Sequence, residues 1–406
     1  MDLARPKLRP IEAFPVEIDG RTLICLRDPL QYAAESLLVP YPAFFVLTLL
    51  DGTHSAVDVQ EAWTRRFGTI LESADLRDLV ATLERHHYLE SEAFDAHVAA
   101  VAAAFRDDAV RRPAHAGISY PDEPDALHRH LDGFFAGVAA RALAGPLRGI
   151  VAPHIDLRVG GRAYGHAYAP LAAAPEVERF VVLGTSHHAG RTLFSATRKD
   201  FATPIGTVAT DRAFLDRLAR QVPEDLYADE LLHRIEHTVE FQVVLLQHVL
   251  GTSRPFSVVP ILVGSFHEMV RAQRAPAREE RVAGFVDALR AALAADPRPT
   301  VVIAGVDLAH VGAKFGDAEG LTPQLLALTE TKDRRLITAL ERGDGDGFFA
   351  EIAADGDRTR VCGLAPLCVF LALMDGAVGS LLHYDRSRDD ATQSTVTYAS
   401  LAFSGG

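Results

Sequence analysis

The sequence predicts an α/β protein in two parts. A small winged-helix-like α+β domain comes first, and a larger domain with a central, mainly parallel sheet flanked by helices follows. Three observations support this fold class. The chain has 406 residues, which is enough for two or three domains. From about residue 147 onward, short apolar runs alternate with helical patterns. The first hundred residues instead combine one hairpin signal with several helix caps.

Composition and charge exclude several classes of protein. The chain is 48% hydrophobic and 23% charged, so it is neither largely disordered nor a coiled-coil rod. A net charge of −13 argues against nucleic acid as the main partner. Three cysteines without regular spacing predict a reducing, cytoplasmic location. The chain start has no apolar leader, and the longest apolar stretch is too short to cross a bilayer, so we expect no membrane association.

The first domain opens with a predicted hairpin. Asp19-Gly20 is a turn signal between strands expected at residues 16–18 and 23–26. An apolar, helix-like run follows at residues 43–50, and Asp51-Gly52 ends it.

Capping residues mark two further helices in this domain. Ser55 is a good N-cap for a helix that continues to about Phe67 and that Gly68 ends. We expect Ser73 to cap the next helix and residues 86–90 to form a strand start or wing. This order is that of a winged helix-turn-helix. Its third helix carries more acidic than basic residues, which would repel the phosphates of DNA.

Two segments and one residue carry a resemblance to the PqqD-like peptide-recognition domain: Leu49-Leu50-Asp51-Gly52-Thr53, Tyr88-Leu89-Glu90 and Val59. The resemblance implies a first domain over residues 1–95. A small accessory domain without its own ligand is the alternative. Residues 96–112 are Ala-rich and then charged, which predicts a linker helix, and a second domain then spans residues 113–406.

Apolar runs in the second domain predict its sheet. The expected strands are residues 149–152, 180–183, 256–263 and 300–304, with closing strands at 379–384 and 395–401. The expected helices between them are residues 211–222, 238–250 and 281–294.

Three of these strands end in side chains that bind metals. His154 follows the first strand, His187-His188 the second, and Asp307 and His310 the fourth. Because ligands sit beyond the carboxyl ends of strands in open α/β sheets, we expect these groups to converge. Imidazoles and carboxylates on rigid strand ends suit a divalent transition metal. Only one of the adjacent histidines should face the metal. An ordinary hydrogen-bonded role is the alternative for each residue.

Two further segments complete the set of candidates. His237 and Glu240 lie three residues apart on one helical face. This spacing fits a pair of metal ligands, a clamp that orients imidazoles, or an ordinary solvated helix start. We favour the clamp or a contact with substrate. Cys362 precedes a glycine at the start of an apolar helix, and a helix N-terminus favours thiolate. Cys368 fits a buried small hydrophobe.

Five segments together resemble the Memo family, of the type called AmmeMemoRadiSam system protein B. They are Pro153-His154, Gly184-Thr185-Ser186-His187-His188, Glu236-His237-Thr238-Val239-Glu240, Asp307-Leu308-Ala309-His310 and Val361-Cys362-Gly363. The resemblance covers residues 113–403. It implies a fold similar to that of LigB-type class III extradiol dioxygenases.

The resemblance also implies a metal centre. Its ligands would be His154, His187 and Cys362, and its metal would be iron (Fe²⁺) first, with copper or zinc as alternatives. Asp307 and His310 would line the pocket as catalytic groups, with His237 and Glu240 nearby. A radical SAM protein is the partner that the family context implies.

Three functions remain open at this point. The first is a dioxygenase-like oxidoreductase that acts on an unidentified small molecule or peptide. The second is a metal-dependent protein without turnover that binds a peptide or partner. The third is a zinc-type hydrolase with His310 as base and Asp307 orienting it.

Overall fold

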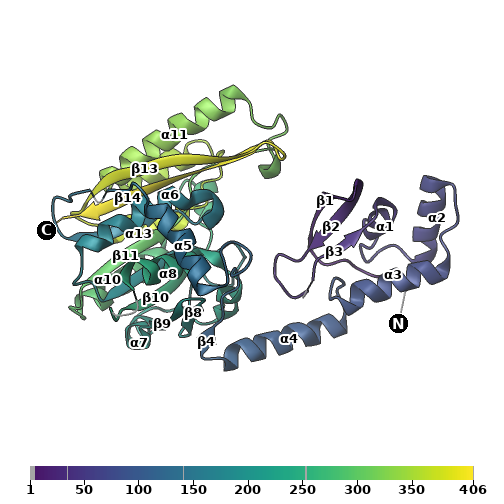
Figure 1. The fold of residues 1–406 in the computed structure, drawn as a ribbon, viewed down its shortest axis with the longest axis horizontal. Coiled ribbons are helices and arrows are strands. Elements are labelled where there is room, and N and C mark those ends of the chain that lie inside the picture. The colour runs from purple at the N-terminus through teal and green to yellow at the C-terminus, as the bar shows by residue number, and fades with distance from the viewer. Residues whose placement is uncertain (1–4, 34, 140, 252–253, 406) are drawn as a thin grey trace. The chain divides into compact units, whose positions relative to one another are not determined.

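A computed structural model of the protein describes residues 5–33, 35–139, 141–251 and 254–405. The chain divides into two compact units, Met1–Asp107 and Asp108–Gly406 (Figure 1). The second unit holds a large mixed sheet flanked by helices, and the first holds a small antiparallel sheet with helices. The predicted α/β fold class is therefore confirmed.

The described part of the first unit combines three strands with four helices. The sheet has the order β1-β2-β3, with β1 at Glu12–Ile18, β2 at Arg21–Arg27 and β3 at Leu37–Val39. The helices are α1 Tyr41–Leu47, α2 Ala56–Phe67, α3 Ser73–Arg85 and α4 Glu92–Asp107.

Local sequence explains how several of these elements begin and end. Asp19 and Gly20 have φ angles of 49° and 72°, and positive φ at both central residues is what a tight hairpin turn requires. The Ser55 side chain accepts a hydrogen bond from the backbone of Asp58, whose carboxylate in turn accepts from the backbone of Ser55. Gly68, with φ of 70°, ends α2 in the left-handed conformation.

Two predictions for this unit were wrong. Ser73 is the first residue of α3 rather than its cap. Its hydroxyl accepts a hydrogen bond from the side-chain Nε2 of Gln60 at 3.0 Å. The strand expected at residues 86–90 is reduced to one isolated bridge between Leu89 and Leu8, because the chain enters α4 directly afterwards. Local patterns predicted both features, and packing within the unit decides them differently.

The described residues of the second unit form an eleven-stranded sheet with the order β12-β14-β5-β11-β6-β10-β9-β8-β4, in which β13 pairs with β14 and β7 with β10. The five strands from β5 to β9 in this order are parallel, and antiparallel pairs flank them. The strands are β4 Val110–Arg111, β5 Leu147–Ala152, β6 Arg179–Thr185, β7 Phe194–Ala196, β8 Asp200–Thr203, β9 Gly206–Thr210, β10 Ser257–Val263, β11 Thr300–Gly305, β12 His310–Gly312, β13 Val378–Asp389 and β14 Ser394–Ser404.

Helices cover both faces of this sheet (Figure 1). In β6, Val181 and Leu183 join the apolar cluster of α7, α10 and α13, whereas Phe180 and Val182 join that of α6 and α8. Burial on both faces explains why the central strands appear as continuous apolar runs. The helices are α5 Pro124–Phe135, α6 Leu157–Tyr168, α7 Arg212–Ala219, α8 His237–Leu250, α9 His267–Arg271, α10 Glu280–Ala294, α11 Pro323–Glu341, α12 Gly345–Ala353 and α13 Leu364–Leu373, with short 3₁₀ helices at Ala169–Ala173, Glu230–Arg234, Pro276–Arg278 and Ala313–Phe315. Within the described ranges, no helix combines the length and apolarity needed to cross a bilayer.

The second unit begins earlier than residue 113. Strand β4 pairs with β8, and the fully buried guanidinium of Arg111 forms an ion pair with the Glu240 carboxylate. Arg111 therefore packs inside the second unit, although the sequence pattern assigned it to a linker at residues 96–112.

This ion pair sets the expected limits of a stable fragment. A chain that begins at Asp108 should fold on its own, because the second unit has its own core. A chain that begins at Pro113 should have a free energy of unfolding about 3–5 kcal/mol lower, because Glu240 loses a buried cationic partner. Urea unfolding followed by circular dichroism compares the two fragments. Equal stability would show that Arg111 does not stabilise this unit.

A buried carboxyl on α11 makes stability depend on pH. Burial raises the pKa of Asp333 to about 6, and the Tyr384 hydroxyl donates to its Oδ2 at 2.8 Å. Because this pKa is higher in the folded than in the unfolded chain, the folded state favours the protonated carboxyl. Its contribution to stability is complete below about pH 4 and is lost as the pH rises through 6.

Replacement of this carboxyl should therefore stabilise the protein only at higher pH. Asp333→Asn should raise the free energy of unfolding by about 1–3 kcal/mol at pH 8 and change it little at pH 4. Urea unfolding at both pH values measures this, with substitution of the exposed Asp287 by Asn as the matched control. A gain of the same size at both pH values would mean that removal of a buried charge is not its cause.

Candidate metal centre

Three neighbouring parallel strands deliver metal-binding side chains to one edge of the sheet. The strands lie in the order β5-β11-β6, and two residues after their ends come His154, Asp307 and His187, respectively. Because parallel strands end on the same side of a sheet, these three side chains meet there. The imidazole rings of His154 and His187 have centroids 5.0 Å apart.

Hydrogen bonds fix the orientation of His154, which is almost completely buried. Its Nδ1 lies 2.9 Å from the carbonyl oxygen of Gly305, so Nδ1 carries the proton and the lone pair is on Nε2. This Nε2 lies 3.3 Å from Sγ of Cys362 and 3.6 Å from Oδ2 of Asp307. Burial, together with the neighbouring imidazoles, holds the pKa of His154 well below its usual value. The ring is therefore neutral, which is the form that binds metals.

Glu236 orients two further imidazoles. Its Oε1 lies 3.1 Å from Nδ1 of His187 and 3.2 Å from Nδ1 of His237. The backbone nitrogens of both histidines also donate to this carboxylate, which caps α8. Burial opposes ionisation of Glu236, but the hydrogen bonds from both imidazoles hold its pKa well below the usual value. Both rings therefore donate through Nδ1, and in its neutral form each keeps the Nε2 lone pair available to a metal. Burial opposes protonation of His187, but the hydrogen bond to Glu236 raises its pKa, so a metal that binds there would displace a proton.

Cys362 enters the cluster from the turn before α13. Its Sγ lies 3.6 Å from the carbonyl oxygen of Asp307, and the nitrogen of Gly363 donates to the same oxygen at 3.1 Å. A Cβ at position 363 would lie 2.7 Å from that oxygen, so only glycine permits this close approach. Burial and the nearby Asp307 raise the pKa of the Cys362 thiol well above its usual value. The helix start alone therefore does not produce the expected thiolate, and a bound cation would be needed.

These side chains form two overlapping groups of potential ligands. Donor atoms of His154, His187 and His237 all lie within 4.8 Å of one another, and so do those of His154, Asp307 and Cys362. The two groups share His154. Imidazole nitrogen, thiolate sulfur and carboxylate oxygen in one cluster fit iron, copper or zinc.

Two other candidates have different positions. His310 begins β12, with its Nδ1 3.2 Å from the carbonyl oxygen of Leu308, and burial lowers its pKa to about 4. Burial raises the pKa of Asp307 to about 7. Glu240 does not join the cluster, because its carboxylate accepts hydrogen bonds from Arg111, Tyr120 and two backbone nitrogens. Glu240 therefore stabilises the packing of the segment from Arg111 to Tyr120 against α8.

Comparison with known proteins gives the family. Residues 111–402 match the family described as Memo-like protein, and this range contains all of the side chains above. The chain belongs to the Memo family. A MEMO1 family protein of Aquifex aeolicus is 28% identical over 98% of this chain and its own full length. A MEMO1 family protein of Methanopyrus kandleri is 30% identical over 73% of this chain and 99% of its own.

One residue of this Memo-family cluster escaped the sequence analysis. The helical spacing of His237 and Glu240 indicates a shared face but gives no separate role to Glu236, which lies directly before His237. The available signal was a carboxylate directly before a histidine at a helix start, where a side chain can cap the helix. Its contact with His187 depends on tertiary structure and has no local pattern.

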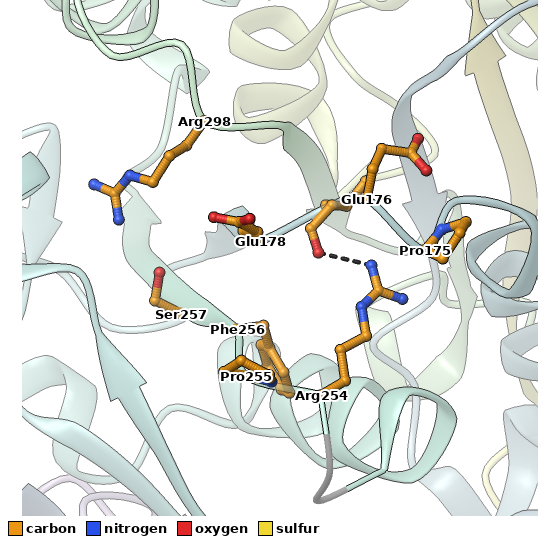
Figure 2. A pocket seen from close by; sticks show the side chains of 9 residues that line it. Pro175, Glu176, Glu178, Arg254, Pro255, Phe256, Ser257 and Arg298 are labelled. Carbon is orange, nitrogen blue, oxygen red and sulfur yellow. Dashed lines mark hydrogen bonds between the residues drawn. The ribbon is translucent and has the colours of Figure 1, made fainter.

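A separate pocket in the Memo-family unit lies at the opposite edge of the sheet. Figure 2 shows it between the residues that precede β6, β10 and β11, and its volume is about 450 Å³. Arg254 donates to the carbonyl oxygens of Ala174 and Val177 at 2.8 and 2.7 Å. Its position at the amino ends of these strands separates this pocket from the histidine cluster, which lies at their carboxyl ends.

Proposed function

We propose that the Memo-family domain is a non-haem metal protein that uses iron in an oxidoreductase reaction related to those of extradiol dioxygenases. The observation that carries the proposal is a set of three imidazoles whose Nδ1 atoms all face fixed hydrogen-bond acceptors. In the neutral rings, every Nε2 lone pair is then available to a metal, beside a thiol and a carboxyl. Such outer hydrogen bonds are typical of histidines that bind metals.

The donor set favours one choice of ligands. We assign His154, His187 and Cys362 as the ligands on the family resemblance, because a thiolate with two imidazoles suits iron or copper. His187 and Cys362 belong to different groups of donors, which share His154, so a bound ion would have to draw these two side chains together. Bound iron would supply electron-transfer and dioxygen chemistry. Burial raises the pKa of the Cys362 thiol, so a bound cation would have to displace its proton and stabilise the thiolate.

The remaining side chains would orient ligands and handle protons. Glu236 holds the rings of His187 and His237, and the backbone nitrogens of His154 and Ile155 both donate to Oδ1 of Asp307. Asp307 can hold or release a proton near neutral pH, and His310 is neutral and can accept one.

The substrate of this proposal is a small molecule or peptide, and a radical SAM protein is its proposed partner. The first unit, as a PqqD-like module, would recognise a peptide. These two statements rest on the family context and on the resemblance described above.

Anaerobic purification followed by metal analysis and oxygen-consumption assays tests the function. The expected result is iron at one equivalent per chain and oxygen uptake that His154→Gln abolishes. Iron or copper that is retained without any oxygen uptake would overturn the enzymatic part and favour a metal-dependent binding protein. Zinc together with esterase or amidase activity would overturn the redox assignment.

A further inference from the structure

A second pair of histidines lies outside this cluster, between α5 and α8. Nδ1 of His128 on α5 lies 3.3 Å from Nδ1 of His248 on α8. His248 is eleven residues beyond His237 on the same helix, which at 1.5 Å per residue places it roughly 16 Å along the axis from the cluster. The pair is therefore a separate feature of the fold.

A carboxylate determines which nitrogen of His248 is free. Oδ1 of Asp132 lies 3.3 Å from Nε2 of His248, and the negative charge of the carboxylate favours a proton on that nitrogen. The lone pair of His248 is then on Nδ1, which faces His128. A carboxylate behind one ring nitrogen is the usual companion of a metal-binding histidine. The His248 side chain is only 11% exposed, and the ring of Phe135 lies 5.6 Å away, so the ring is held in place.

The distance between the two nitrogens fits a tetrahedral metal ion. Zinc binds imidazole nitrogen at about 2.0–2.1 Å, and two ligands at a tetrahedral angle are then about 3.3–3.4 Å apart. The observed separation is 3.3 Å. His128 lies on the exposed surface, so water can fill the other coordination positions.

We propose that His128 and His248 bind a zinc-type divalent cation that links α5 to α8, with Asp132 orienting His248. His128 and Asp132 are four residues apart on α5, so one face of that helix supplies both the ligand and the orienting carboxylate. Such a link would stabilise the folded chain, because an ion that binds only the folded state raises its stability by mass action.

Titration of the metal-free full-length protein with zinc chloride, followed by calorimetry, tests the proposal. The wild-type chain should bind one equivalent more than His128→Gln. Asp132→Asn should bind the same number, with that equivalent about 10–100-fold weaker, because the carboxylate acts through His248. Both positions are exposed, and circular dichroism with the thermal midpoint verifies that each variant is folded.

His54→Gln is the matched control. His54 is a partly exposed histidine with a carboxylate neighbour, Asp51 at 3.0 Å, and its contacts in the described part of the chain include no second imidazole. It should lose no equivalent. Equal stoichiometry and affinity in wild type and His128→Gln would overturn the proposal and mean that the 3.3 Å contact is a hydrogen bond only. Equal losses in His128→Gln and His54→Gln would also overturn it, as nonspecific surface binding.

Discussion

Replacement of Cys362 by serine should remove most of the iron or copper from the protein while the fold stays intact. In the proposed centre the thiolate is the one soft ligand, and its sulfur lies 3.3 Å from Nε2 of His154. A serine hydroxyl is neither soft nor ionised at neutral pH. Loss of a residue that only orients a ligand already weakens metal binding about tenfold. We therefore expect loss of the ligand itself to lower the metal affinity by at least about tenfold. Anaerobic titration with Fe²⁺ against a competing chelator measures the change.

Cys368→Ser is the matched control for this variant. Cys368 lies on α13, six residues further along, and it packs against the apolar core of the second unit. Its substitution should leave metal affinity unchanged and lower the free energy of unfolding by about 1–3 kcal/mol, because a hydroxyl is less well accommodated there. Unchanged metal affinity in Cys362→Ser would instead move the third ligand to His237 or Asp307, which belong to the same two groups of donors.

The sequence was most informative where local pattern and tertiary structure coincide. Continuous apolar runs identified the central strands because those strands are buried on both faces. The topology of a parallel sheet then placed His154, His187 and Asp307 at one edge, and the structure brings them together there. The position of Cys362 beside them depended on the family resemblance, since the residue is far from the strands in the sequence.

The sequence was least informative where one side chain contacts a distant segment. Arg111 follows a charged, Ala-rich stretch, and only tertiary contacts, its pairing in β4 with β8 and its ion pair with Glu240 on α8, show that it belongs to the second unit. The same contact withdraws Glu240 from the cluster, although its helical spacing from His237 suggested a shared role. Spacing along a helix specifies a face, whereas the partner on that face is determined by the rest of the fold.

Glu236→Gln should weaken metal binding about 10–100-fold without unfolding the protein. The carboxylate accepts from Nδ1 of both His187 and His237 and thereby keeps both Nε2 lone pairs free. A glutamine side chain has one oxygen, and its amide group donates hydrogen bonds. Both Nδ1 atoms contact Oε1, whereas Oε2 accepts from the backbone nitrogen of His187, so the glutamine amide group would face that N–H as a second donor. This repulsion should displace the side chain from the rings, and an imidazole that loses its acceptor can carry its proton on Nε2, where it can no longer bind a metal. Chelator competition measures the affinity, and ¹⁵N NMR of the metal-free protein reports the tautomer of each histidine.

Glu240→Gln is the control that separates orientation from stability. It makes the same chemical change one turn further along α8, but at a carboxylate that pairs with Arg111 rather than with the imidazoles. We expect it to lower the free energy of unfolding by about 3–5 kcal/mol, because it leaves a buried guanidinium without its charged partner, and to leave the histidine tautomers unchanged. If Glu236→Gln and Glu240→Gln weakened metal binding equally while all tautomers stayed the same, stability would govern affinity. Orientation of the imidazoles by Glu236 would then have no part in it.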